Sequence, residues 1–135
     1  MQKKNSFTIQ EAQKKLEHYC AYQERCHWEV KQKLKEIEMI PAAQELIISK
    51  LIEENYLNES RFAQSFARGK FRIKKWGKQR IIRELKAKKI SPYNIKLALK
   101  EISESDYQST FYSLFEKRKE SVSNNSISIQ KKKRK

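Results

Sequence analysis

The sequence predicts an all-α protein made of tandem three-helix repeats, similar to helix-turn-helix modules, stacked as a short curved solenoid of about seven helices. Only two glycines and two prolines occur in 135 residues, which leaves few of the breaks that a β-rich fold requires. Apolar residues recur at helical spacing along most of the chain. Segments about fifty residues apart also repeat each other: adding 51 to Leu34, Pro41, Leu46 and Leu51 gives Leu85, Pro92, Leu97 and Ile102.

The first repeat is predicted over residues 8–56, after a flexible N-terminus at 1–7. Thr8 and Glu11 form a capping-box pattern, and the helix that follows is expected to end near Tyr22, with apolar positions Ile9, Ala12, Leu16, Tyr19 and Cys20. A second helix is expected over His27–Ile37, with Val30, Leu34 and Ile37 on its apolar face. Pro41 suits the first turn of a third helix, which reaches about Asn55 with apolar positions Ala43, Leu46, Ile47, Leu51 and Ile52.

The second repeat is predicted over residues 57–102. Asn58 is a suitable N-cap for a fourth helix to about Lys75, whose apolar face is Phe62, Phe66, Gly69 and Ile73. Gly77 is expected to form a left-handed turn before a fifth helix with apolar positions Ile81, Ile82 and Leu85. Ser91 and Pro92 begin a sixth helix with the apolar face Ile95, Ala98, Leu99 and Ile102.

Residues 103–120 are predicted to form the first helix of an incomplete third repeat. Ser103 and Asp106 can cap this helix, and its apolar residues are Tyr107, Phe111, Leu114 and Phe115. The remaining segment, 121–135, is polar, low in complexity and ends in five consecutive basic residues. We expect it to be a disordered basic tail that binds polyanions without specificity.

The positive charge is concentrated in two places. The chain carries a net charge of +15, and residues 68–89 contain eleven basic residues and one acid, Glu84. The tail supplies the other five positive charges, so the rest of the chain is neutral. A solvated helix face usually mixes charges of both signs, and this stretch does not, which favours an anion-binding surface. The residues expected to contact the anion are Arg61, Arg68, Arg72, Lys74, Lys75, Lys78, Arg80 and Arg83.

Trp76 lies within this basic stretch, and Trp28 lies near the start of the second predicted helix. Either ring could stack on a nucleic-acid base. An aromatic residue at a helix end more often fills the gap between helices. We therefore expect both tryptophans to pack inside the protein.

The sequence gives little support for a catalytic site or a metal site. Cys20, Cys26, His18 and His27 do not match a zinc-ligand spacing, and no nucleophile is paired with a base and an orienting group. No glycine-rich phosphate loop is present. We expect no catalytic residues, no metal and no cofactor. The absence of an apolar run long enough for a membrane span or a secretory signal, with two cysteines, predicts a cytoplasmic protein that does not bind membranes.

The motifs of the second repeat resemble those of the RecX family, modulators of the bacterial RecA recombinase. The matching positions are Leu57, Asn58-Glu59, Phe62-Ala63, Arg68, Lys75-Trp76-Gly77, Arg80-Ile81, Glu84-Leu85 and Lys88-Lys89-Ile90. The structural part of this motif is Leu57, Phe62, Ala63, Phe66, Gly77, Ile81, Leu85 and Ile90. The phrase around Trp76 is similar to members from Bacteroidetes-type bacteria. Asn58 replaces an acid of the family, and Lys89 replaces a glycine, so the turn after the fifth helix must close without the residue that best tolerates positive φ.

The resemblance implies a noncatalytic regulator in DNA repair. Such a protein binds RecA, in the groove of its filament on single-stranded DNA, and inhibits strand exchange and ATP hydrolysis by the partner. Family members usually complete a third repeat. Two alternatives therefore stay open: a free-standing nucleic-acid-binding protein, or an inactive truncated remnant of the family. We expect the protein to be a monomer.

Overall fold

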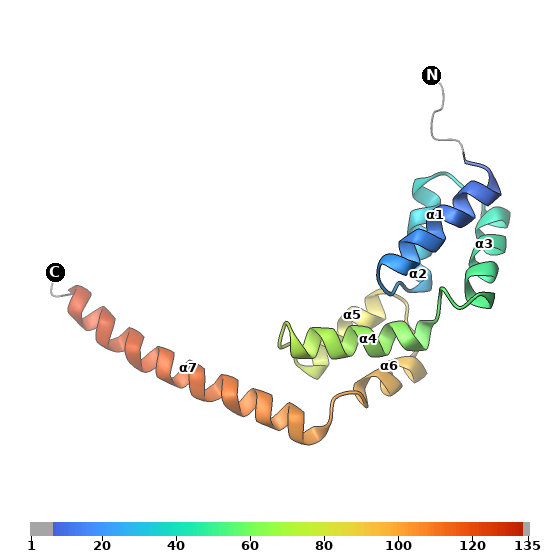
Figure 1. Ribbon diagram of the computed structural model, residues 1–135. Helices are drawn as coiled ribbons and strands as arrows, with labels where there is room; N and C mark the ends of the chain where they lie inside the picture. The colour runs from blue at the N-terminus through green and yellow to red at the C-terminus, as the bar shows by residue number, and fades with distance from the viewer. Residues whose placement is uncertain (1–6, 134–135) are drawn as a thin grey trace. The chain divides into compact units, whose positions relative to one another are not determined.

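The computed structural model describes the backbone of residues 7–133 and the side chains of residues 7–119. Those residues form helices and no strands (Figure 1), so the all-α prediction is confirmed. The chain divides into two compact units, Met1–Glu101 and Ile102–Lys135. The first unit holds six helices: α1 (Ile9–Tyr22), α2 (His27–Glu36), α3 (Pro41–Glu53), α4 (Glu59–Arg72), α5 (Lys78–Ala87) and α6 (Pro92–Leu99). The second unit contains α7 (Glu104–Lys133).

Helices α1, α2 and α3 pack against one another as the first three-helix repeat. The predicted capping box begins α1: the Glu11 amide donates to Thr8 Oγ1 at 3.0 Å, and the Thr8 amide donates to Glu11 Oε1 at 2.9 Å. Pro41 occupies the first turn of α3, where its missing amide leaves no hydrogen bond unmade. The shared core consists of buried apolar side chains, mainly Ala12, Leu16, Val30, Leu34, Ile47, Leu51 and Leu57.

The second repeat is built from α4, α5 and α6, and its most extensive packing joins α4 to α6. Asn58 caps α4 as predicted, since its Oδ1 accepts the Arg61 amide at 2.9 Å. Of the residues in the structural motif, Phe66 and Gly77 are half-buried. The other six are buried: Leu57, Phe62, Ala63, Ile81, Leu85 and Ile90.

The two repeats end their second helices in the same way. Glu38 after α2 and Lys89 after α5 have φ values of 62° and 64°. In each case the next amide, Met39 or Ile90, donates to the carbonyl five residues earlier, at 3.0 and 3.1 Å. A left-handed residue followed by this bond is the usual helix stop in which glycine is preferred. Lys89 therefore closes this turn in the left-handed conformation, without the glycine that best tolerates it.

Two predictions about the end of α4 were wrong. Gly77 has φ −76° and is the extended N-cap of α5, whereas the left-handed residue is Lys75 with φ 60°. The bond from the Trp76 amide to the Lys70 carbonyl at 3.1 Å places that turn two residues earlier than expected. Ile73, which was predicted to lie on the apolar face of this helix, instead follows the last residue of α4 and is 77% exposed.

The apolar faces of three helices in the first unit also differ from the prediction. On α1, Ile9 is exposed. On α4, Ala67 and Phe71 are buried with Phe62 and Ala63, so the stripe is rotated from the set that included Gly69. On α3, Leu46 and Ile52 are exposed. The predicted and the observed stripes of α4 both satisfy helical spacing, and only the packing against neighbouring helices selects between them.

The second unit begins with a capped helix. Ser103 Oγ accepts the Asp106 amide at 3.1 Å, and the rings of Tyr107 and Phe111 are 4.8 Å apart. Phe115, predicted to be apolar core, is exposed. Helix α7 runs to Lys133, whereas we expected no regular structure in 121–135; no glycine or proline interrupts the segment. The predicted flexible N-terminus lies outside the described residues, except for Phe7.

Candidate functional site

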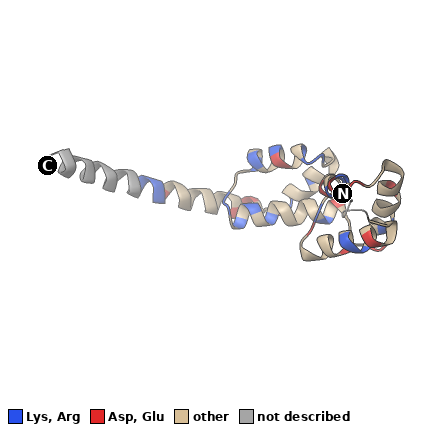
Figure 2. Ribbon diagram, turned by 90° about the horizontal axis from the view of Figure 1, so that it is seen from above, with Lys and Arg blue, Asp and Glu red and all other residues tan. Residues whose placement is uncertain are grey.

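The candidate site is a basic surface where the end of α4 meets the start of α5. The short turn at 73–77 joins the last turns of α4 to the first turns of α5, and the two helices pack together. Figure 2 shows lysine and arginine recurring along this part of the chain. We define the basic surface as Arg68, Arg72, Lys74, Lys75, Lys78, Arg80 and Arg83.

Five residues of the basic surface are exposed: Arg72, Lys74, Lys75, Arg80 and Arg83. None of them forms an ion pair with a residue in the part of the chain whose side chains are described. Exposed cations grouped within residues 72–83 raise the local positive potential and attract polyanions. Because their charge is not neutralised within the protein, it is available to an external ligand.

The N-terminus of α5 adds to this potential. Gly77 provides no side-chain cap, and the first turn of α5 contains no acid. The first amides of a helix lack internal partners and form the positive end of its dipole. The positive end of the α5 dipole therefore lies beside Lys78 and Arg80 and adds to their positive charge.

Trp76 lies half-buried within the basic surface. Its ring meets the Phe66 ring edge-on, with centroids 6.1 Å apart, so it contacts α4 but is not enclosed as expected. The Arg80 guanidinium is 4.1 Å from the centre of the Trp76 ring, and Lys70 Nζ is 5.0 Å from it. These cation–π contacts hold the two cations in place beside the turn.

Arg68 is partly neutralised, which the sequence did not reveal. Its Nη1 lies 2.9 Å from Glu101 Oε1, with side-chain exposures of 40% and 32%. Exposed pairs of this kind contribute about 0–1 kcal/mol. The acid lies 33 residues away at the end of the second repeat, beyond the reach of any local spacing rule. Arg68 therefore contributes less to the basic surface than its five exposed neighbours.

Arg61 was expected to contact an anion, but its guanidinium is occupied by its own chain. Its Nε donates to Glu24 Oε2 at 2.6 Å, and its Nη atoms reach Asn55 and the Tyr56 carbonyl. These bonds join the start of α4 to the loop before α2. Arg61 thus stabilises the junction between the repeats rather than the basic surface.

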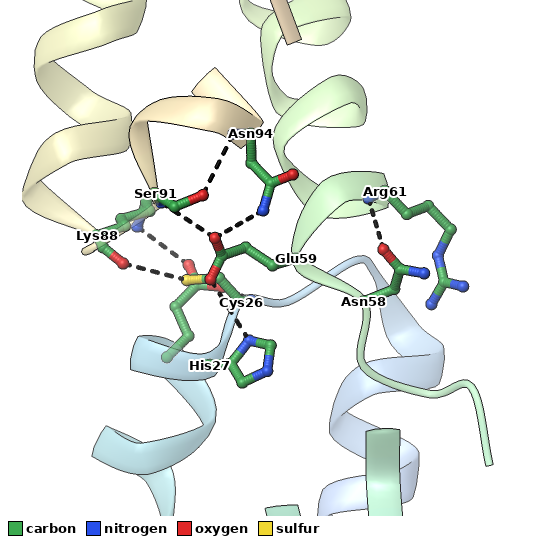
Figure 3. A network of polar contacts seen from close by, with 9 residues as sticks. Cys26, His27, Asn58, Glu59, Arg61, Lys88, Ser91 and Asn94 are labelled. Atoms are coloured by element: carbon green, nitrogen blue, oxygen red, sulfur yellow. Dashed lines mark hydrogen bonds and ion pairs between the residues drawn. The ribbon is translucent and has the colours of Figure 1, made fainter. Parts of the chain in front are cut away.

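The same junction contains a second polar link, shown in Figure 3. Lys88 Nζ lies 3.0 Å from Glu29 Oε2, and the Lys88 carbonyl accepts a weak bond from Cys26 Sγ at 4.0 Å. The other oxygen of Glu29 accepts the Cys26 amide at 3.1 Å. The C-terminal end of α5 is thereby attached to the N-terminal end of α2, which joins the basic surface to the first repeat.

Glu59 completes the junction, and its environment favours the carboxylate. Partial burial opposes ionisation, but hydrogen bonds from the Ser91 amide at 3.0 Å and Asn94 Nδ2 at 2.8 Å, with His27 nearby, outweigh it and lower the pKa of Glu59. His27 Nδ1 is 3.9 Å from Glu59 Oε1. Glu59 therefore links α2, α4 and the start of α6 as a charged group (Figure 3).

The two cysteines are not arranged for chemistry. Both are buried and free, and burial raises the pKa of each thiol to about 11. The thiolate is the form that attacks electrophiles and binds metals, so both thiols are inert at neutral pH. In the part of the chain that the structure describes, no group of three His, Cys, Asp or Glu residues could hold a metal ion. No described helix is long and apolar enough to cross a membrane.

Comparisons with known proteins agree with the repeat architecture. Residues 58–99 match the family model described as RecX, second three-helix domain, which contains all seven residues of the basic surface. The regulatory protein RecX of Lactobacillus gasseri is 35% identical over 89 residues, which cover 66% of this chain and 33% of that protein. The regulatory protein RecX of Lactobacillus johnsonii is 33% identical over 89 residues, which again cover 66% of this chain and 33% of that protein. The matched region therefore spans about a third of the length of these relatives, and neither supports the Bacteroidetes-like lineage.

Solved structures show the same fold. The crystal structure of RecX from Lactobacillus salivarius has a TM-score of 0.78 and 25% identity, covering 86% of this chain and 75% of that one. A crystal structure of a regulatory protein RecX has a TM-score of 0.70 and 24% identity, covering 76% of this chain and 51% of that one. Both likenesses cover more of the chain than residues 58–135 contain, so they include at least part of the first repeat.

Proposed function

The chain belongs to the RecX family, and from that premise we propose that it is a noncatalytic regulator of the RecA recombinase. It binds the RecA filament on single-stranded DNA and inhibits strand exchange and ATP hydrolysis by RecA. The relatives in the comparisons carry the name regulatory protein. Inert thiols and the lack of a metal-ligand cluster among the described residues are compatible with a role that needs no chemistry of its own.

The observation that carries the proposal is the basic surface within the matched residues 58–99. A nucleoprotein filament presents phosphates, and each phosphate that a cation neutralises releases condensed counterions. The exposed cations Arg72, Arg80 and Arg83 offer this contact without losing an ion pair to a described residue. The junction around Lys88 and Arg61 connects that surface to the first repeat, so both repeats can engage one filament.

A titration of RecA ATPase activity on single-stranded DNA tests the function. We expect hydrolysis to fall as this protein is added, with the effect complete at or below one copy per RecA monomer. A folded protein, verified by circular dichroism, that leaves the ATPase rate unchanged at every ratio contradicts the proposal.

A second candidate is a free-standing nucleic-acid-binding protein. It is favoured by the grouping of unpaired cations around Trp76, which requires no RecA to bind a polyanion. This candidate predicts DNA binding in the absence of RecA with a steep salt dependence. DNA binding that leaves RecA ATPase unaffected selects it over the regulator.

A further inference from the structure

A groove on the first repeat combines cations with an aromatic ring and uses none of the residues of the basic surface. It has a volume of about 610 Å³ and is bordered by α2, α3 and Lys89. Trp28, Lys31 and Lys35 line it from α2, and Glu45 and Ser49 line it from α3. The groove therefore offers a charged wall, a flat apolar ring and polar groups opposite.

The charged wall has a regular spacing. Lys31 and Lys35 are one turn apart on α2, which corresponds to about 6 Å along the helix axis. Both are exposed, as is Lys89, and none of the three forms an ion pair with a described residue. Three unpaired ammonium groups along one groove suit a ligand with repeated negative charges, such as a phosphodiester backbone.

Trp28 lines this groove, whereas we expected it to pack inside the protein. Its ring is half-buried, and Lys88 Nζ lies 5.5 Å from its centre. The same ammonium group is held by Glu29 at 3.0 Å, so the ring and its cation belong to the junction of the repeats. Base stacking on such aromatic rings is the common way to hold an unpaired nucleotide.

The aromatic and polar sides of the groove favour nucleic acid over an acidic peptide. An acidic peptide would place its carboxylates on the lysines but would leave Trp28 without a stacking partner. Bases, in contrast, carry N–H donors, which are the ring N3–H in thymine and exocyclic amino groups in the other bases, and a carboxylate and the Ser49 hydroxyl can accept them. We propose that the groove binds the unpaired nucleotides of a single-stranded nucleic acid, with a base on Trp28 and phosphates on Lys31, Lys35 and Lys89. This site is additional to the basic surface and does not depend on RecA.

The two tryptophans of the chain allow a direct test. In the full-length Trp76→Phe variant, Trp28 is the sole tryptophan, and titration with oligo(dT) is expected to quench its fluorescence to saturation. Adding Lys31→Glu and Lys35→Glu is expected to weaken this binding at least tenfold. The slope of log K against log salt is expected to fall by about 1.4, because two phosphate contacts of ~0.7 each are lost.

The matched control on the same background is Lys14→Glu with Lys96→Glu, two exposed lysines outside the groove with the same change in charge. It is expected to keep the quenching, and all variants are expected to keep the thermal melting curve. The proposal is overturned if the control loses binding as much as the groove variant, or if poly-glutamate or duplex DNA quenches Trp28 as strongly as oligo(dT). It is also overturned if labelled oligo(dT) binds, by anisotropy, without a change in Trp28 fluorescence. RecA is absent throughout, so these outcomes are separate from those of the ATPase titration.

Discussion

The ion pair between Lys88 and Glu29 is expected to stabilise the junction between the two repeats. The Lys88 and Glu29 side chains are 23% and 17% exposed, and their charged atoms are 3.0 Å apart. Breaking a fully buried pair costs about 3–5 kcal/mol, and breaking an exposed pair costs about 0–1 kcal/mol. At this intermediate burial we expect Lys88→Met to lower the free energy of unfolding by about 2 kcal/mol, because Glu29 keeps its charge without a partner.

A double-mutant cycle measured by urea denaturation tests this value. Glu29→Gln retains an oxygen for the Cys26 amide and is expected to cost about 1 kcal/mol. The double variant is expected to cost about 1 kcal/mol less than the sum, since the two changes remove the same interaction. Lys50→Met is the control, because its pair with Glu54 is 54% and 44% exposed, and it is expected to cost less than about 0.5 kcal/mol. Additive effects at Lys88 and Glu29 would refute the role of this ion pair.

Three further predictions follow from the local geometry. Cys20 and Cys26, with pKa values raised to about 11, are expected to react with Ellman's reagent at pH 8 only after unfolding; fast reaction of the native protein would contradict their burial. Lys89→Gly is expected to raise the free energy of unfolding by about 0.5–1 kcal/mol, since φ is 64°, whereas Lys86→Gly inside α5 is expected to lower it by about 1 kcal/mol. Equal effects of these two changes in urea melts would exclude strain at Lys89. Because the pKa of Glu59 is lowered from its ordinary value of 4.5, its stabilisation is present above pH 4.5 and is lost as the pH falls through the lowered value. Glu59→Gln is therefore expected to destabilise the protein in urea melts at pH 7, and its effect is expected to shrink as the pH falls below 4.5; a pH-independent effect would contradict this.

Local sequence signals were sufficient to predict the helices and their repetition. Capping residues such as Thr8, Asn58 and Ser103, and the prolines at 41 and 92, act within one turn of the chain, so the starts of the helices could be predicted from them. The offset of 51 residues also predicted that α2–α3 and α5–α6 are equivalent, which the matching turns at Glu38 and Lys89 support. Long-range packing was needed for the buried stripe of α4, because two sets of residues there had the same helical spacing.

The basic surface could be predicted in position but not in the state of each cation. Its place in the chain followed from the local excess of charge. The partners of Arg61 and Arg68 could not be found, since Glu24 and Glu101 are 37 and 33 residues away. The left-handed turn was expected at Gly77 from its residue type, but the hydrogen bond from Trp76 to Lys70 places it at Lys75.

We propose that the exposed cations of α4 and α5 bind a RecA filament. The most direct measurement is the equilibrium binding of fluorescently labelled protein to RecA filaments on single-stranded DNA at several salt concentrations. It compares Arg72→Glu/Arg83→Glu with the control Lys14→Glu/Lys96→Glu. We predict that the first variant binds at least tenfold more weakly with a flatter salt dependence, while the control keeps the affinity of the unmodified protein. Equal affinities of the two variants, with unchanged melting curves, would contradict the claim.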